Sequence, residues 1–220
     1  MTTSSALQDL PDSAITSLFS REDIALLLID HQPQMIFGAR SADPQTLVNN
    51  VTALAKLAKV FDLPTVLTSI AAETFSGPVI PEITRALPGV EVIDRSYINA
   101  WQDGAFRAAV EATGRRRLLM AGLWTEVCLT FPALSATEAG YEVFAVIDAS
   151  AGSSTAAHDA AIVRMSQQGV IPVSTASVLS ELQRDWARTD TYDAVNDIVS
   201  DHMGAWGQGV NYVRAGFTKK

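Results

Sequence analysis

The feature that most constrains the fold of this 220-residue chain is the alternation of short apolar runs with longer amphipathic stretches. The apolar runs, each typical of a buried parallel strand, cover residues 24–29, 65–69, 90–93, 118–121, 143–147 and 170–173. Helical periodicity lies between them: one helix begins near Pro44, one covers 81–87, one follows Gln102, and two cover 129–139 and 157–168. Strands that alternate with helices form parallel sheets, so the sequence predicts an α/β fold.

The length of 220 residues suits one domain with a full-sized core. We expect this domain over residues 1–188, with a polar leader over 1–21, and a C-terminal arm over 189–220 where the periodicity weakens. The arm is predicted to pack on the domain or on a neighbouring subunit. Its aromatic residues Trp206, Tyr212 and Phe217 would leave a monomer with poorly covered apolar surface, which favours a homo-oligomer.

The composition indicates which classes of partner and which cellular compartment to expect. The net charge of −8 disfavours nucleic acid and anionic membranes as partners. No apolar run approaches the roughly 18 residues of a membrane span, and the N-terminus has no basic or apolar region typical of a signal peptide. One cysteine rules out an intramolecular disulfide, which suits a reducing environment. We therefore expect a cytoplasmic protein that binds a small molecule and contacts neither nucleic acid nor membrane.

The single cysteine, Cys128, lies just after the apolar run 118–122, where Thr125 has N-cap chemistry and a helical pattern begins. Backbone N–H groups and the positive end of the helix dipole favour a thiolate at such a position. The alternative is an inert buried cysteine, because free cysteine is among the most buried residue types. With a nearby guanidinium, the functional interpretation predicts a thiol pKa below the usual value of about 8.5.

Polar side chains follow three of the predicted strands. The first strand ends in Asp30-His31-Gln32, the third in Asp94-Arg95 followed by Asn99 and Trp101, and the fourth leads to Cys128. Ligands of open α/β sheets bind outside the carboxyl ends of the strands, so these groups are expected at one site. An acid, a cation and a thiol are a sufficient set for nucleophilic catalysis by cysteine.

The motifs LLLIDHQ (26–32), RSYINAW (95–101), AGLWTEVC (121–128) and IDASAG (147–152) resemble those of the isochorismatase-like cysteine hydrolases. The similarity covers about residues 22–188 and is closest to the YcaC-like subgroup. It implies a three-layer α/β/α fold with a six-stranded parallel sheet in the Rossmann-like order 3-2-1-4-5-6. It also implies a homo-oligomer that needs no cofactor, with an octamer as the form that the subgroup suggests.

The resemblance further implies roles for individual residues. Asp30 would accept the thiol proton, Cys128 would attack a carbonyl carbon to form a thioester, and Arg95 takes the place of the family's usual lysine. A guanidinium does not readily lose a proton, so Arg95 could stabilise charge but not shuttle protons. The family's non-proline cis peptide would fall between Trp124 and Thr125, which would aim the amides of Thr125 and Cys128 at an oxyanion.

Other polar residues near the strand ends have weaker claims. Gln32, Asn99 and Trp101 are predicted to contact substrate, against the alternative that they only pack. Nicotinamidase-type members hold a metal through an acid and two histidines after the second strand, but residues 68–75 contain no histidine, so no metal is expected. His31 is a possible neighbour of the site, whereas His158 and Glu126 are interpreted as ordinary surface or capping residues.

Two classes of function stay open at this point. The resemblance favours an amidohydrolase that cleaves a C–N bond of a small amide through a cysteine thioester. The alternative is a catalytically idle homologue that serves as a binding or assembly scaffold, which the replacement of the usual lysine by Arg95 makes worth testing. Ether hydrolysis without a covalent step fits less well because it does not use Cys128, and a redox switch lacks a resolving cysteine.

Overall fold

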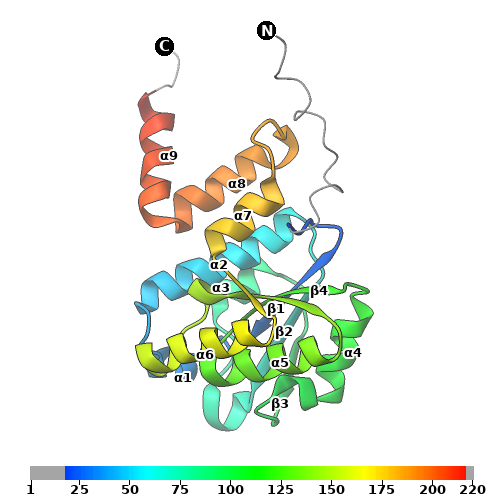
Figure 1. Ribbon diagram of the computed structural model, residues 1–220. Helices are drawn as coiled ribbons and strands as arrows, with labels where there is room; N and C mark the ends of the chain where they lie inside the picture. Colours follow the sequence, from blue (N-terminus) through cyan, green and yellow to red (C-terminus); the bar gives the residue numbers. More distant parts are fainter. Residues whose placement is uncertain (1–17, 217–220) are drawn as a thin grey trace.

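The computed structural model describes residues 18–216, so most of the polar leader and Phe217 lie outside the described part of the chain. Six strands form one sheet: β1 (Ile24–Ile29), β2 (Thr65–Ile70), β3 (Val92–Arg95), β4 (Arg117–Gly122), β5 (Glu142–Val146) and β6 (Ile171–Val173). All five pairings are parallel, and the order is β3-β2-β1-β4-β5-β6 (Figure 1). The predicted fold class and strand order are confirmed.

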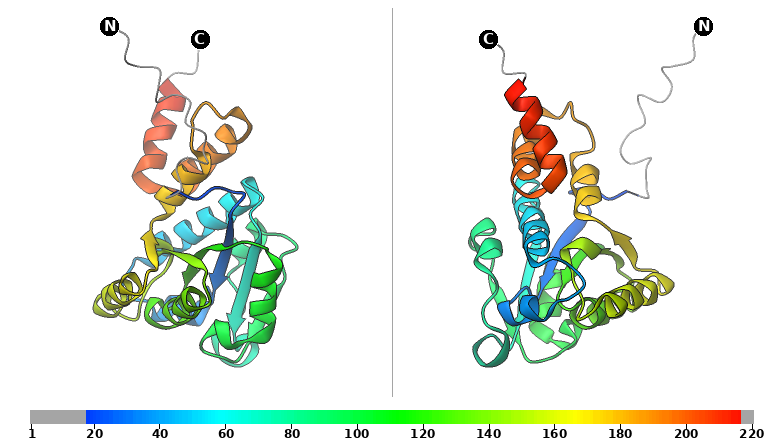
Figure 2. Two further views of the ribbon diagram at one scale, coloured as in Figure 1. Left: turned by 45° about the vertical axis from the view of Figure 1, so that its right-hand side comes forward. Right: turned by 90° about the vertical axis from the view of Figure 1, so that its left-hand side faces the viewer.

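Helices connect these strands and cover both faces of the sheet (Figure 2). They are α1 (Pro33–Gly38), α2 (Pro44–Val60), α3 (Pro81–Ala86), α4 (Gly104–Ala112), α5 (Thr130–Glu138), α6 (Thr155–Gln167), α7 (Thr175–Gln183), α8 (Thr189–His202) and α9 (Gly204–Gly216). Short π-helical turns, η2 (Ala72–Ser76) and η4 (Thr125–Leu129), follow β2 and β4, and 3-10 turns, η3 (Ala100–Gln102) and η5 (Ile147–Ala149), follow β3 and β5.

The central strand β1 shows why the molecule has three layers. All six of its residues are buried, and alternate side chains point to opposite faces of the sheet. Leu26 and Leu28 join the apolar cluster built with α2, α3, α7 and α8, whereas Leu27 and Ile29 join the cluster built with α4, α5 and α6. A strand buried on both faces reads as a continuous apolar run, which is how it was found in the sequence.

The described part of the C-terminal arm, residues 189–216, is helical, although the periodicity of its sequence is weak. Helix α8 packs against α2 through buried residues such as Val195 and Val199, and α9 packs on α8. Both helices lie beyond the end of the sheet at which β1 begins, opposite the loops that follow the strands (Figures 1 and 2). Within residues 18–216, no helix has the length and apolar character needed to cross a bilayer.

Candidate active site

The predicted acid, cation and thiol meet at the carboxyl ends of the strands β1, β3 and β4. Asp30 follows β1, Arg95 is the last residue of β3, and Cys128 lies in the η4 turn after β4. The order of strands reverses between β1 and β4, so Asp30 and Cys128 flank the switch point at which such sheets bind ligands. Arg95 comes from the edge strand, and its long side chain reaches past β2 to Asp30.

Asp30 and Arg95 form an ion pair in which both side chains are fully buried. The Arg95 Nη2 atom lies 2.7 Å from Asp30 Oδ2, and Nη1 donates to the Tyr97 carbonyl at 2.5 Å. Asp30 has a φ of 59°, an uncommon left-handed conformation for a residue with a side chain, and such strain clusters at functional sites. Asp30 Oδ1 and Arg95 Nε have no hydrogen-bond partner in the described part of the chain. These two atoms are therefore available to reacting groups.

The Cys128 thiol is only 5% exposed and faces the Asp30 carboxylate. Burial raises the pKa of this thiol, and the negative charge of Asp30 raises the pKa further. The Arg95 guanidinium and the Trp124 backbone N–H oppose this effect, but they are outweighed. The predicted lowering of the thiol pKa is therefore wrong. The physical reasons are that burial disfavours the thiolate and that the Asp30 carboxyl group stands beside the sulfur, while Arg95 is paired with Asp30.

Burial also raises the pKa of Asp30, with the Arg95 charge acting in the opposite direction. A carboxyl group with a raised pKa is a better proton acceptor than an ordinary aspartate. The resting site thus holds a neutral thiol beside the Asp30 carboxyl group, whose ionised form is favoured by Arg95 and disfavoured by burial.

A non-proline cis peptide lies at the start of the turn that carries Cys128, but it joins Leu123 to Trp124. The predicted position, Trp124–Thr125, is wrong by one residue. The Thr125 N–H donates to the Ala151 carbonyl at 3.0 Å, so it is not free to bind an oxyanion as predicted. Instead, the Trp124 N–H is the backbone donor that acts on the Cys128 sulfur.

The Trp124 side chain is held by the loop after β1. Its indole Nε1 donates to the Met35 carbonyl at 2.9 Å, and its ring packs on Gly38. A Cβ atom on Gly38 would lie 2.4 Å from Trp124 Cζ2, so only glycine fits against this ring. The loops that carry Asp30 and Cys128 are therefore joined through Trp124.

The three residues predicted to contact substrate use their polar groups to build the loops. Gln32 accepts from the Ile70 N–H at 2.9 Å and donates to the Gly77 carbonyl at 2.5 Å. Asn99 accepts from the Trp101 N–H at 3.0 Å and donates to Ser135 Oγ at 3.1 Å. The Trp101 ring packs edge-on against Phe106 and Tyr141. Contact of these residues with a substrate remains a prediction.

His31, next to Asp30 in the chain, is almost completely buried. Its Nε2 atom lies 3.0 Å from the Ala149 carbonyl, while Nδ1 has no partner among the described residues. Burial lowers the pKa of His31 to about 4, so the ring is neutral at pH 7. Within residues 18–216, no three or more His, Cys, Asp or Glu side chains are grouped as metal ligands.

Two residues that sequence reasoning treated as ordinary brace the η4 turn. His158 Nδ1 is hydrogen-bonded to Thr125 Oγ1 at 2.8 Å, and Glu126 Oε1 accepts from the N–H and hydroxyl of Ser153. The partner residues lie on segments after β5, far from η4 in sequence. The IDASAG motif was the one signal that this region approaches the site, since Ala151 and Gly152 belong to it.

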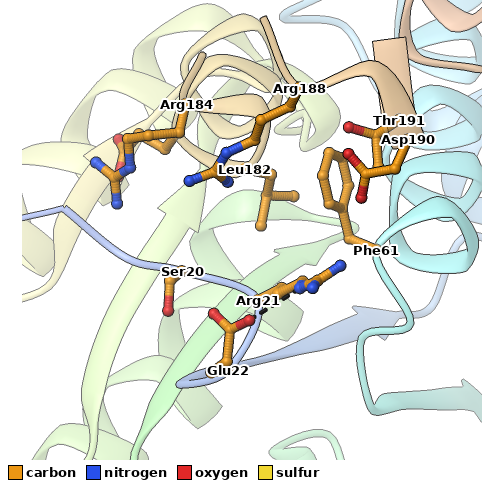
Figure 3. Close-up of a pocket in the computed structure, with 10 residues that line it drawn as sticks. Ser20, Arg21, Glu22, Phe61, Leu182, Arg184, Arg188, Asp190 and Thr191 are labelled. Atoms are coloured by element: carbon orange, nitrogen blue, oxygen red, sulfur yellow. Dashed lines mark hydrogen bonds and ion pairs between the residues drawn. The ribbon is translucent and has the colours of Figure 1, made fainter. Parts of the chain in front are cut away.

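A separate cavity of about 300 Å³ lies at the other end of the sheet (Figure 3). It is lined by Ser20, Arg21, Glu22, Phe61, Glu181, Leu182, Arg184, Arg188, Asp190 and Thr191. Its three arginines are matched by three carboxylates, and Arg21 forms an ion pair with Glu22. Because Ser20–Glu22 precede β1 and Phe61 precedes β2, this cavity is remote from Cys128.

Comparison with known proteins decides the family. The isochorismatase domain model matches residues 24–177, which is most of the chain. The chain belongs to the isochorismatase family. Asp30, Arg95 and Cys128 all lie within the matched range.

Individual relatives agree with this assignment and with the predicted YcaC-like subgroup. The probable hydrolase YcaC of Escherichia coli is 41% identical over 83% of this chain and 88% of its own length. Its crystal structure, described as an octameric hydrolase of unknown specificity, has a TM-score of 0.86 and covers 90% of this chain and 97% of the other. YcaC from Pseudomonas aeruginosa, solved with hexane-2,5-diol and covalent acrylamide, has a TM-score of 0.85 at 37% identity, with the same coverage.

Proposed function

We propose that the protein is a cysteine hydrolase that cleaves a C–N bond of a small amide. The observation that carries this proposal is the buried arrangement of Cys128, Asp30 and Arg95, with a 2.7 Å ion pair beside the thiol. A purely structural cysteine would gain nothing from a carboxylate that raises its pKa and a strained backbone at that carboxylate. Burying the charges of Asp30 and Arg95 costs free energy, and a role in catalysis would explain why the fold accepts this cost.

In the first half of the reaction, Cys128 Sγ bonds to the substrate carbonyl carbon while the thiol proton passes to Asp30 Oδ1, which has no hydrogen-bond partner among residues 18–216. The C–N bond then breaks, and the nitrogen leaves with the proton that Asp30 received. The products of this half are an amine, or ammonia, and a thioester on Cys128.

In the second half, water attacks the thioester carbonyl and gives its proton to Asp30. The C–S bond breaks, a carboxylic acid is released, and the sulfur takes back the proton from Asp30. The same aspartate thus accepts and returns one proton in each half, and the enzyme ends in its starting state.

Arg95 stays protonated throughout, because a guanidinium does not lose its proton in a protein. When Asp30 is ionised, Arg95 balances its charge. When Asp30 holds the proton, the cation is left to stabilise negative charge on sulfur or on the substrate oxygen. Replacement of the family's usual lysine by Arg95 is compatible with turnover in this scheme, since no proton is routed through the cation.

The relatives support hydrolysis without naming a substrate. YcaC of Escherichia coli is described as a hydrolase of unknown specificity, and its Pseudomonas counterpart was solved with covalent acrylamide, a small amide. Acrylamide alkylates thiols at its alkene carbon, so a covalent adduct supports a nucleophile such as Cys128 and carries no information on amide cleavage. The alternative of an idle scaffold predicts the same buried triad but no turnover.

Steady-state turnover on a panel of small aliphatic, aromatic and carbamoyl amides tests the proposal. We expect ammonia or amine release by the wild-type chain and none by Cys128→Ala. Replacement of Asp30 by Asn, which keeps the shape of the side chain, should abolish turnover as well. Release that persists in Cys128→Ala would refute the covalent mechanism, and no turnover on any amide by the wild-type chain would favour the scaffold.

We also propose that the chain forms a homo-oligomer, as does the Escherichia coli relative, which is described as an octamer. The helical arm presents a groove of about 460 Å³ lined by Trp186, Tyr192, Trp206, Val210 and Val213, with Trp186 half exposed. Such an apolar surface is typical of a protein contact. Light scattering at micromolar concentration should give a multiple of the 23.5 kDa chain mass, and a mass of 23.5 kDa would refute the proposal.

A further inference from the structure

The turn that carries Cys128 is held from behind by helix α6 and the segment just before it. Thr125, the first residue of η4, is fully buried, and every polar group it has is in use. Its N–H donates to the Ala151 carbonyl, its carbonyl accepts from Thr130 Oγ1 at 2.6 Å, and its hydroxyl is hydrogen-bonded to His158. Of these contacts, only the one to His158 joins two side chains.

His158 lies in the first turn of α6, which packs directly against η4. Its ring is half buried, and its Nδ1 atom lies 2.8 Å from Thr125 Oγ1. No hydrogen bond or ion pair joins His158 to Asp30, Arg95 or Cys128 in the described part of the chain, so it does not touch the reacting atoms. Any effect that it has on the reaction must pass through the turn.

Glu126, the next residue of η4, also links this turn to the segment just before α6. Its Oε1 atom binds Ser153, and its Oε2 atom is buried without a partner against Gly152. A Cβ atom on Gly152 would lie 2.7 Å from Glu126 Oε2 and 3.0 Å from the backbone nitrogen of His158. The absence of a side chain at Gly152 therefore lets the turn and the helix approach each other closely.

We propose that His158 is a positioning residue that fixes the η4 turn, through Thr125, so that the Cys128 sulfur is held against Asp30. This inference rests on the proposed function, because it treats Cys128 as the nucleophile. A shift of about 1 Å in a reacting group can cost on the order of a hundredfold in rate, so one hydrogen bond at the base of the turn is enough to matter.

Different substitutions of His158 should have different effects, because only some of them keep a hydrogen-bond partner for Thr125. Asparagine places a polar side-chain atom near the position of Nδ1, so His158→Asn keeps a hydrogen-bond partner for Thr125 without a titrating ring. His158→Ala removes the partner, and Thr125→Val removes the hydroxyl from the other side while keeping the shape. His202, another half-buried histidine, lies at the end of α8, and α8 lies beyond the end of the sheet opposite the active site, so His202→Ala is the matched control.

Two measurements on the full chain test the inference: turnover of the amide found by the panel, and the pH dependence of iodoacetamide alkylation. Alkylation reports on one site, because Cys128 is the only cysteine. We expect His158→Ala and Thr125→Val each to lower kcat about tenfold with little change in KM, and the double variant to be no worse than either. The alkylation midpoint should move down toward the usual thiol value of about 8.5, because the sulfur withdraws from Asp30.

His158→Asn should restore both wild-type readouts, and His202→Ala should change neither. Simple loss of stability would lower the melting temperature without moving the alkylation midpoint of the folded protein. The inference is overturned if His158→Ala keeps the wild-type kcat and midpoint, or if His158→Asn loses as much as His158→Ala. Should the wild-type chain turn over no amide, the proposed function fails, whereas the alkylation profiles still decide whether His158 positions Cys128.

Discussion

Acidification from pH 7.5 to 5.0 should destabilise the protein through His31. The pKa of this buried ring is lowered from 6.5 to about 4 on folding, because burial disfavours the imidazolium. The unfolded chain therefore binds the proton more readily than the folded one. The contribution of neutral His31 to the free energy of unfolding is fully present above pH 6.5 and is lost progressively as the pH falls from 6.5 toward 4.

The magnitude follows from the two pKa values. At pH 5.0 the unfolded histidine is almost fully protonated while folded His31 is almost fully neutral, and the difference is worth about 2 kcal/mol of unfolding free energy. For a chain of 220 residues this corresponds to roughly 4–8 °C in melting temperature. The loss of unfolding free energy levels off below pH 4 at about 3 kcal/mol.

The assay is urea unfolding of the wild-type chain and of His31→Gln at pH 7.5 and 5.0, at one protein concentration. Glutamine keeps a donor for the Ala149 carbonyl but cannot titrate. Other groups, including His158 and His202, contribute equally to both proteins and cancel in the difference. We expect the wild-type chain to lose about 2 kcal/mol more than His31→Gln between the two pH values. Equal losses in the two proteins would show that the pKa of His31 is not lowered by burial.

Four further outcomes test the site. Arg95→Met leaves the buried Asp30 carboxylate unpaired, so denaturant unfolding should show a loss of about 3–5 kcal/mol. Asp30→Asn removes the charge that raises the thiol pKa, so alkylation of the thiol should begin at a lower pH than in the wild type while turnover is lost. Gly38→Ala places a Cβ atom against the Trp124 ring, so thermal unfolding should show a loss of about 1–3 kcal/mol and kcat should fall. Residues 68–75 contain no histidine, so turnover should survive dialysis against a chelator; activity that is lost and then restored by zinc would contradict this.

The sheet and the place of the site could be predicted because both follow from local patterns. A strand buried on both faces must be a continuous apolar run, and the six runs lie within a few residues of the six strands. Parallel strands end at one edge, so residues that follow different strands had to meet there. Asp30, Arg95 and Cys128 were brought together by this topology alone.

The properties that could not be predicted depend on contacts between distant segments. The helix dipole and the Arg95 cation that should lower the thiol pKa of Cys128 are present, but burial and Asp30 raise this pKa by more. The relative size of these effects depends on the packed structure and cannot be read from the sequence. Gln32 resembles a substrate contact because it is polar and follows Asp30, yet its amide is satisfied by the backbone of the β2 loop. His158 is an ordinary helical residue until α6 is placed against η4.

The protonation of the resting site bears on how the nucleophile is formed. With a raised thiol pKa, little thiolate exists before substrate binds, so the site differs from cysteine enzymes that store an ion pair of thiolate and cation. Here the stored ion pair is Asp30 with Arg95, and the thiol is neutral beside it. In the proposed mechanism, attack on a carbonyl carbon and transfer of the proton to Asp30 then occur together, because a free thiolate is unfavourable in this buried site. A neutral thiol reacts more slowly with oxidants and alkylating agents than a thiolate does, so we expect slow reaction of Cys128 in the absence of substrate. A substrate whose carbonyl carbon is held near the sulfur forms a bond to it as the proton leaves, so no free thiolate is needed. Reaction of Cys128 would then depend on correct binding of the substrate.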